Sequence, residues 1–328
     1  MRYLDAESVR RAMPAPGELV ELAALALRSL VAGAKMPAKA ALDPDVGGVF
    51  AHAMPARLRA SEVPGGGAPA DLLGLKWIAG GSGNRARGLA AMAALVVLDD
   101  PVTGAPVAVL EGGAITAART AALSGVAVQL LGGGGETSAR RAVIVGAGVQ
   151  GRAHAEVLGA VLPGVELAIH DRHPERAEAL AREATTMSGV GAAEPVIDPS
   201  SSLARGDVVV CATSLMTSPV LGPADVAPEA LVIPVDYGAY VRPELVASAA
   251  TFVVDDPAQF EGHRRTGRLA GWPDPTAILG ELLAAGGSPD RSGLKVALHQ
   301  GPGIADVIVA DAVLRRATAL GLGQELAR

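Results

Sequence analysis

Residues Arg140–Leu158 read RRAVIVGAGVQGRAHAEVL, and this stretch decides the fold. Ala142–Val145 is a short apolar run typical of a buried strand; Gly146, Gly148 and Gly151 follow, and then a helical stretch. In a dinucleotide-binding turn the first glycine permits the tight turn, the second lets backbone approach the pyrophosphate, and the third lets helix pack close to strand. Free N–H groups at the helix start then face the phosphates. The stretch therefore predicts a dinucleotide-binding domain.

The choice of cofactor is indicated by the next predicted strand, Glu166–His170, which ends at Asp171. An acid about 20 residues beyond the last glycine is placed to hold the ribose diol of an adenosine, which favours NAD. Arg172 stands beside it and can accept the 2′-phosphate of NADP. We therefore expect NAD, with NADP left open.

Composition excludes several classes of protein. The chain has 328 residues, half of them hydrophobic, so two domains with substantial cores are expected. The net charge of −6 and the absence of a basic stripe make nucleic acid an unexpected partner. Apolar runs such as Leu89–Leu98 fall short of the ~20 residues of a membrane span, and the N-terminus is charged where a signal peptide is apolar. One cysteine fits a reducing compartment, so we expect a cytoplasmic protein without membrane contact.

The order of predicted elements separates two kinds of architecture. Up to about residue 115, two helices precede mainly antiparallel strands, and Thr116 is predicted to cap the helix that follows. After Asp171, strands alternate with helices, which favours a doubly wound parallel sheet. Predicted strands cover 49–54, 72–79, 89–98, 106–110, 142–145, 166–170, 208–211, 231–235, 252–254 and 294–298. Predicted helices cover 6–13, 18–30, 116–131, 175–184, 243–249, 257–268 and 304–320.

Three cations outside the dinucleotide turn are candidate ligands for an anion: Lys39, Lys76 and Arg119. Lys76 lies among apolar residues of a predicted strand, and Arg119 lies in a run of small residues that leaves its head group few local partners. A buried cation needs an anion, and a substrate carboxylate is one candidate. The alternative is that each side chain reaches water or pairs with a structural acid such as Glu111.

The sequence contains no motif typical of a metal site or of a serine hydrolase. The six histidines are scattered without the spacing of a zinc pair, so no metal is expected. The G-x-S-x-G motif of serine hydrolases does not occur. Cys211 ends an apolar strand and is interpreted as a core residue, and His52 is interpreted as a structural residue at a strand end.

A series of motifs spread along nearly the whole chain points to one family. They are Lys76-Trp77, Asn84, Ala114–Ala122 (AITAARTAA), Val145–Gly151 (VGAGVQG), Cys211–Ser214 (CATS), Val235–Tyr237 (VDY), Pro243–Leu245 (PEL), Val253–Asp255 (VVD) and Gly303–Asp306 (GIAD). In this order they resemble the ornithine cyclodeaminase/mu-crystallin family. The resemblance implies a Rossmann-type NAD(P)-binding domain over 121–302. It is inserted in an α+β substrate-binding and dimerisation domain made of 1–120 plus 303–328, and a homodimer is expected.

The resemblance also implies roles for individual residues. Lys39, Lys76 and Arg119 match the residues that hold the substrate α-carboxylate in the family. Lys39 stands where the family usually has arginine, so a point charge replaces a bidentate fork. The positions that match cofactor-contacting residues, besides the glycines, are Val149, Gln150 and Thr213.

One departure from the family concerns the catalytic acid–base group. Cyclodeaminases carry an aspartate six residues before the glutamate that matches Glu244, and this chain has Gly238 there. The nearest acid is Asp236, two residues earlier, on the same face of an extended chain but displaced by roughly 6–7 Å. Asp236 is either the catalytic acid–base group or a carboxylate that holds the loop or the cofactor.

The expected function follows from the chemistry that the family shares. Hydride passes between nicotinamide C4 and the α-carbon of an amino acid, which interconverts amine and imine. Because the usual aspartate is missing, we expect an NAD(P)-dependent amino-acid dehydrogenase or ketimine reductase, with catalysis by Asp236 and Lys76. One alternative is an ornithine cyclodeaminase, which forms proline and ammonia with catalytic NAD. Another is a non-catalytic, cofactor-dependent small-ligand binding protein.

Overall fold

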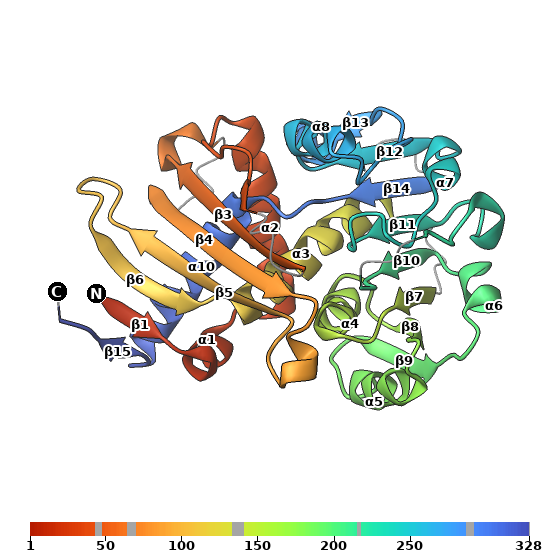
Figure 1. Cartoon of the computed structure of the whole chain (residues 1–328), viewed down its shortest axis with the longest axis horizontal. Coiled ribbons are helices and arrows are strands. Elements are labelled where there is room, and N and C mark those ends of the chain that lie inside the picture. The colour runs from red at the N-terminus through yellow and green to blue at the C-terminus, as the bar shows by residue number, and fades with distance from the viewer. Residues whose placement is uncertain (43–47, 64–69, 133–140, 215–217, 287–291, 328) are drawn as a thin grey trace. The chain divides into compact units, whose positions relative to one another are not determined.

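The computed structural model describes residues 1–42, 48–63, 70–132, 141–214, 218–286 and 292–327. The chain divides into two compact units. Unit 1 comprises Met1–Arg119 and Gly301–Arg328, and unit 2 comprises Thr120–Gln300. A seven-stranded sheet lies in unit 1 and an eight-stranded sheet in unit 2 (Figure 1).

Unit 1 is a mostly antiparallel sheet with helices on one face. Its strands are β1 (Arg2–Leu4), β2 (Ala40–Leu42), β3 (Val49–Leu58), β4 (Leu72–Gly81), β5 (Met92–Asp99), β6 (Pro106–Glu111) and β15 (Gln324–Glu325). Its helices are α1 (Ala6–Ala12), α2 (Pro16–Val31), α10 (Gly303–Ala319) and the start of α3 (Gly113–Leu131). The strand order is β15-β1-β6-β5-β4-β3-β2; among these described strands β1 and β6 pair in parallel, and the other neighbours are antiparallel.

The last helix, α10, covers the buried face of this sheet. It packs on β3, β4 and β5 and on α2, and it crosses behind the sheet in Figure 1. Along β4 the residues alternate between this face and the opposite one: Lys76 and Ile78 are buried, whereas Trp77 is 40% exposed. The strand predicted over 72–79 is therefore present, its side chains alternate between two faces, and the lysine belongs to the buried face.

Unit 2 is a doubly wound parallel sheet, as the sequence predicts. Its strands are β7 (Arg141–Val145), β8 (Val165–His170), β9 (Val190–Pro195), β10 (Val208–Cys211), β11 (Leu231–Pro234), β12 (Thr251–Val254), β13 (Ala277–Ile278) and β14 (Lys295–Leu298). Its helices are α4 (Val149–Val161), α5 (Pro174–Ala184), α6 (Ser200–Leu203), α7 (Pro243–Ala247), α8 (Pro257–Arg265) and α9 (Leu279–Ala284). The order β13-β12-β14-β11-β10-β7-β8-β9 is parallel throughout. It reverses direction at β7, the strand before the glycine turn.

Several predicted bounds are corrected by the structure. Helix α3 begins at Gly113 rather than at a Thr116 cap, and the Thr116 hydroxyl instead donates to the carbonyl of Gly112 at 2.7 Å. Strand β3 continues to Leu58, and β5 begins at Met92. Helix α3 is long and apolar enough for a membrane span by length and composition, but 78% of that window is buried within the protein, as in the core helix of a globular domain.

Candidate active site

The two predicted cations Lys76 and Arg119 come together on one carboxylate. Lys76 Nζ lies 2.8 Å from Oδ1 of Asp306, and Arg119 Nε lies 2.9 Å from the same oxygen. Lys76 and Asp306 are completely buried and Arg119 is 6% exposed. Strand β4, helix α3 and helix α10 each contribute one member of the group. The partner acid is thus Asp306, not Glu111, whose carboxylate accepts from the backbone N–H of Gly113.

Two features of this cluster bear on ligand binding: an unsatisfied acceptor on Asp306 and the planar guanidinium of Arg119. Oδ2 of Asp306 is buried without a hydrogen-bond partner among the described residues. Arg119 contacts Asp306 through Nε, and one side of its guanidinium packs closely against Gly301, where a side chain would overlap Nη1. A planar fork of this kind fits a carboxylate through two parallel hydrogen bonds.

Burial makes the lysine of the cluster a weak base. It lowers the pKa of Lys76 to about 7, with the positive charge of Arg119 acting in the same direction and Asp306 opposing. Lys39 also lowers this pKa, which places its charge within electrostatic reach of Lys76. Burial raises the pKa of Asp306, but the charges of Arg119 and Lys76 outweigh it and the net shift is downward. At neutral pH the cluster thus holds an ionised acid beside an amine that can gain or lose a proton.

The glycine turn of unit 2 has the local geometry that a dinucleotide requires. Gly146 has a φ of +111°, and a side chain there would overlap the carbonyl oxygen of Ala212. A side chain at Gly151 would overlap the carbonyl oxygen of Gly146. At Gly148, which precedes α4, an added Cβ would meet no described atom within 4 Å. Two glycines are therefore demanded by the protein's own packing, whereas Gly148 keeps an open approach to the helix N-terminus.

Groups around this turn fit a dinucleotide. Val149 is 72% exposed at the start of α4, and Oε1 of Gln150 is buried without a hydrogen-bond partner among the described residues. Asp171 accepts from the N–H groups of Ala147 and His173, both at 2.9 Å, and each of its oxygens can accept one more hydrogen bond. Arg172 is exposed beside Asp171 and available to a 2′-phosphate. The residues present are thus compatible with NAD and with NADP.

Asp236 lies near the carboxyl end of β11 and is held by Thr213, which follows β10. The Thr213 hydroxyl donates to Asp236 Oδ2 at 2.5 Å, and Oδ1 is buried without a hydrogen-bond partner among the described residues. Burial raises the pKa of Asp236 to about 6, and the Thr213 hydrogen bond opposes that rise. Acids with a pKa near neutrality are suited to proton transfer.

The loop after Asp236 cannot hold an aspartate at position 238 without rearrangement. Gly238 has a φ of +73°, and an added Cβ would lie 2.6 Å from Cζ2 of Trp272. Tyr237 has a φ of +57°, a left-handed conformation that is rare for a bulky residue and often found at functional sites. Its hydroxyl donates to the Gln300 carbonyl at 3.1 Å. Asp236 is consequently the acid that this loop presents.

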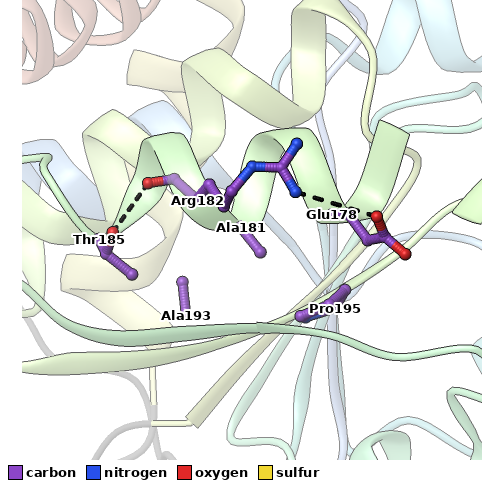
Figure 2. Close-up of a pocket in the computed structure, with 6 residues that line it drawn as sticks. All are labelled: Glu178, Ala181, Arg182, Thr185, Ala193 and Pro195. Carbon is purple, nitrogen blue, oxygen red and sulfur yellow. Dashed lines mark hydrogen bonds and ion pairs between the residues drawn. The ribbon is translucent and has the colours of Figure 1, made fainter. Parts of the chain in front are cut away.

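One surface hollow is unrelated to the predicted residues. Figure 2 shows it between α5 and β9, lined by Glu178, Ala181, Arg182, Thr185, Ala193 and Pro195. Arg182 pairs with Glu178 at 3.9 Å, and the Thr185 hydroxyl donates to the Arg182 carbonyl at 2.8 Å. Its polar side chains are engaged locally, and we assign it no function.

A doubly wound sheet with a glycine turn at its switch point, together with a unit that buries two cations on one acid, defines a two-domain dinucleotide-binding protein. The chain belongs to the ornithine cyclodeaminase/mu-crystallin family, whose sequence profile matches residues 7–319.

Individual relatives support this family assignment. The Δ1-pyrroline-2-carboxylate reductase of Thermococcus litoralis, solved with NADH and L-proline, has a TM-score of 0.84 and 25% identity, covering 99% of this chain and 100% of that chain. An archaeal alanine dehydrogenase dimer with bound NAD has a TM-score of 0.82 and 25% identity; the match covers 100% of this chain and 99% of that chain. The nodulation efficiency protein NfeD of Rhizobium meliloti is 29% identical over 258 residues, 76% of this chain and 77% of that protein.

Proposed function

We propose that this protein is an NAD(P)-dependent oxidoreductase that interconverts amine and imine at the α-carbon of an amino acid or cyclic imino acid. The observation that carries the proposal is the buried pair Lys76 and Arg119, which share one oxygen of Asp306 through Lys76 Nζ and Arg119 Nε, so that this contact does not use the Nη1–Nη2 fork of the guanidinium. A substrate carboxylate supplies the acceptor that this fork matches. Relatives of similar fold include a pyrroline-carboxylate reductase and an alanine dehydrogenase, both of which act on such substrates.

The chain's own residues perform binding and proton handling in this reaction. Gly146, Gly148 and Gly151 shape the turn for the pyrophosphate, and Asp171 accepts from the adenosine ribose. Nicotinamide, when bound, supplies or takes up the hydride. Lys76 and Arg119 hold the substrate carboxylate, which restricts the orientation of the α-carbon. Val149, Gln150 and Thr213 complete the cofactor contacts.

Proton transfer is assigned to the two groups whose pKa values lie near neutrality. Asp236, with a pKa of about 6, exchanges a proton with the substrate nitrogen. Lys76, with a pKa of about 7, is the second proton-transfer group and lies where the substrate carboxylate binds. Two buried groups whose pKa values are shifted toward neutrality are typical of catalytic sites, which favours an enzyme over a non-catalytic binding protein. Because Gly238 cannot house the usual family aspartate, the dehydrogenase or reductase reaction is favoured over cyclodeamination.

The decisive assay incubates the purified protein with NAD or NADP and a panel of L-amino acids including ornithine, and with NADH or NADPH and cyclic imines. Stoichiometric change in the NADH absorbance, with a keto or imino acid formed or consumed, is the expected result. Proline and ammonia from ornithine without net NADH would instead establish a cyclodeaminase. Cofactor binding without turnover on any substrate would establish the binding-protein alternative.

A substitution at Lys76 separates catalysis from folding. Lys76→Met should abolish turnover, because both the carboxylate contact and the titrating amine are lost, while NADH affinity stays unchanged. Fluorescence titration of NADH and circular dichroism of the same sample provide the two measurements. Loss of the folded state in Lys76→Met would show that the ion pair of Lys76 with Asp306 is required for folding.

We further propose that the protein is a cytoplasmic homodimer that associates through the outer face of the unit 1 sheet. On this face, opposite α10, the exposed apolar side chains include Trp77 and Leu95, at 40% and 43% exposure. Trp77 and Leu95 are register partners on β4 and β5. An apolar face of this kind is typical of a protein–protein interface, and the archaeal alanine dehydrogenase relative is a dimer.

A further inference from the structure

A second polar cluster is buried inside unit 2 and is not used by the proposed function. Ser124 of α3, His154 of α4 and His299, which directly follows β14, are 1%, 1% and 5% exposed. Ser124 Oγ lies 2.8 Å from His154 Nε2 and 2.7 Å from His299 Nε2. A hydroxyl bridging two imidazoles at this depth must have a defined proton order, because each polar atom depends on its neighbour for a hydrogen bond.

The proton order follows from the far end of the cluster. His154 Nδ1 lies 2.7 Å from the Gln150 carbonyl oxygen, which can only accept, so Nδ1 carries a proton. Burial lowers the pKa of His154 to about 4, so at neutral pH the ring is neutral and Nε2 is an acceptor. Ser124 therefore donates to His154, and its own oxygen accepts from His299. The proton that His299 directs at Ser124 is thus on Nε2.

His299 stands at the edge of the sheet where ligands of doubly wound folds bind. Val254 and Leu298 are register partners, so Asp255 and His299 are the first residues beyond their strands. The next N–H, that of Gln300, donates to Asp255 Oδ2 at 2.9 Å. On the other side of β14 lies β11, whose continuation carries Asp236. The acids that follow the two flanking strands are thus Asp255, directly after β12, and Asp236, two residues after β11, at the carboxyl edge of the sheet.

We propose that Ser124 is a positioning residue that, through His154, holds His299 in the Nε2–H tautomer. This makes Nδ1 the atom at which His299 gains and loses a proton beside the acids that follow β11 and β12. In other functional histidines too, the hydrogen bond made by one ring nitrogen fixes the tautomer and so the role of the other nitrogen. The inference deepens the proposed function and rests on it for its consequence: a positive charge on His299 favours ionised Asp236, the proposed acid–base group.

The first test is nuclear magnetic resonance of protein with 15N-labelled histidine, the six rings being assigned by His→Gln variants. His154 should show a neutral Nδ1–H ring from pH 5.5 to 9, and His299 a fixed proton on Nε2. In Ser124→Ala the single tautomer of His299 should be replaced by a mixture, and Ser124→Thr should restore it. A His299 proton fixed on Nδ1 in the natural protein, or an unchanged tautomer in Ser124→Ala, would overturn the proposal.

The second readout is the pH profile of kcat/KM. Ser124→Ala should move the acidic limb by about 0.5 pH unit to higher pH, because a mispositioned His299 stabilises ionised Asp236 less. Ser29→Ala is the matched control, since Ser29 is equally buried in unit 1 and its hydroxyl donates to the Leu25 carbonyl of its own helix. An unmoved limb alongside an altered tautomer would overturn the link to Asp236. The tautomer measurement needs no turnover, so it remains decisive even if the proposed oxidoreductase activity fails.

Discussion

Asp306 offers one oxygen, Oδ1, to two buried cations, and this sharing gives the residue a large effect on stability. Asp306→Asn should reduce the free energy of unfolding by about 3 kcal/mol or more, because Lys76 and Arg119 would be left buried without their anion. Urea unfolding is the measurement. Asp311→Asn provides the control on the same helix, since its ion pair with Arg315 is partly exposed and should be worth less than about 1 kcal/mol. Equal losses in the two variants would contradict a buried cluster.

Ionisation of Asp236 lowers the stability of the folded protein, and the ionised carboxylate is the proposed acid–base group. Its pKa of about 6 lies above the ordinary 3.8, so between pH 3.8 and 6 the folded state binds more protons than the unfolded state and stability falls as pH rises. Asp236→Asn should therefore stabilise the protein by about 3 kcal/mol at pH 7, a gain that disappears below pH 4, while turnover falls. Chemical unfolding at both pH values checks this. A destabilised variant at pH 7 would show that the ionised carboxylate serves the loop instead.

Single residues also show what sequence reasoning can reach. Lys76 and Arg119 stood out because a cation in an apolar or small-residue run lacks local partners. Their partner Asp306 lies 230 and 187 residues away, a distance that no local pattern resolves. His154 and His299 looked scattered in the sequence, and only the fold places Ser124 between them.

At the scale of elements, the glycines of the turn between β7 and α4 have different roles: some are required by the packing of the protein, and one is required by ligand binding. Gly148→Ala should leave the free energy of unfolding within about 1 kcal/mol, because its φ of −88° suits alanine and no described atom lies near the added Cβ. Dinucleotide affinity should fall more than about tenfold, since the methyl group occupies the pyrophosphate approach.

Gly151→Ala is the contrasting variant for that turn. Its Cβ overlaps the Gly146 carbonyl oxygen, so the fold itself should be destabilised. Thermal unfolding and NADH fluorescence titration on both variants provide the comparison. Undiminished NADH binding by Gly148→Ala would contradict the assignment of the turn as the cofactor site.

Helices and strands with many apolar residues in a regular pattern could be predicted from the sequence, whereas elements with few apolar or β-branched residues could not. The parallel strands β7, β10 and β11 are continuous apolar runs, apart from Arg141 at the start of β7, and were predicted within one residue. Strand β9 was missed because VGAAEP contains a single β-branched residue, and it forms through its parallel pairing with β8. Helix α3 was predicted to start at Thr116, but its hydroxyl bonds backwards to Gly112 in the first turn.

At the scale of the whole molecule, the outer face of the unit 1 sheet is expected to decide assembly. Trp77→Asp with Leu95→Asp places two like charges opposite each other on β4 and β5, and in a homodimer the same charges recur on the partner. We expect sedimentation velocity to show a dimer for the natural protein and a monomer for this double variant.

The matched control for that experiment is Val102→Asp, which adds a charge to an apolar residue that is 91% exposed in the turn between β5 and β6. It should leave the dimer intact, because a residue so exposed in a turn contributes little apolar surface to the outer face of the sheet. Circular dichroism on all three proteins separates dissociation from unfolding. A double variant that remains a folded dimer would place the interface elsewhere and remove the role proposed for Trp77 and Leu95.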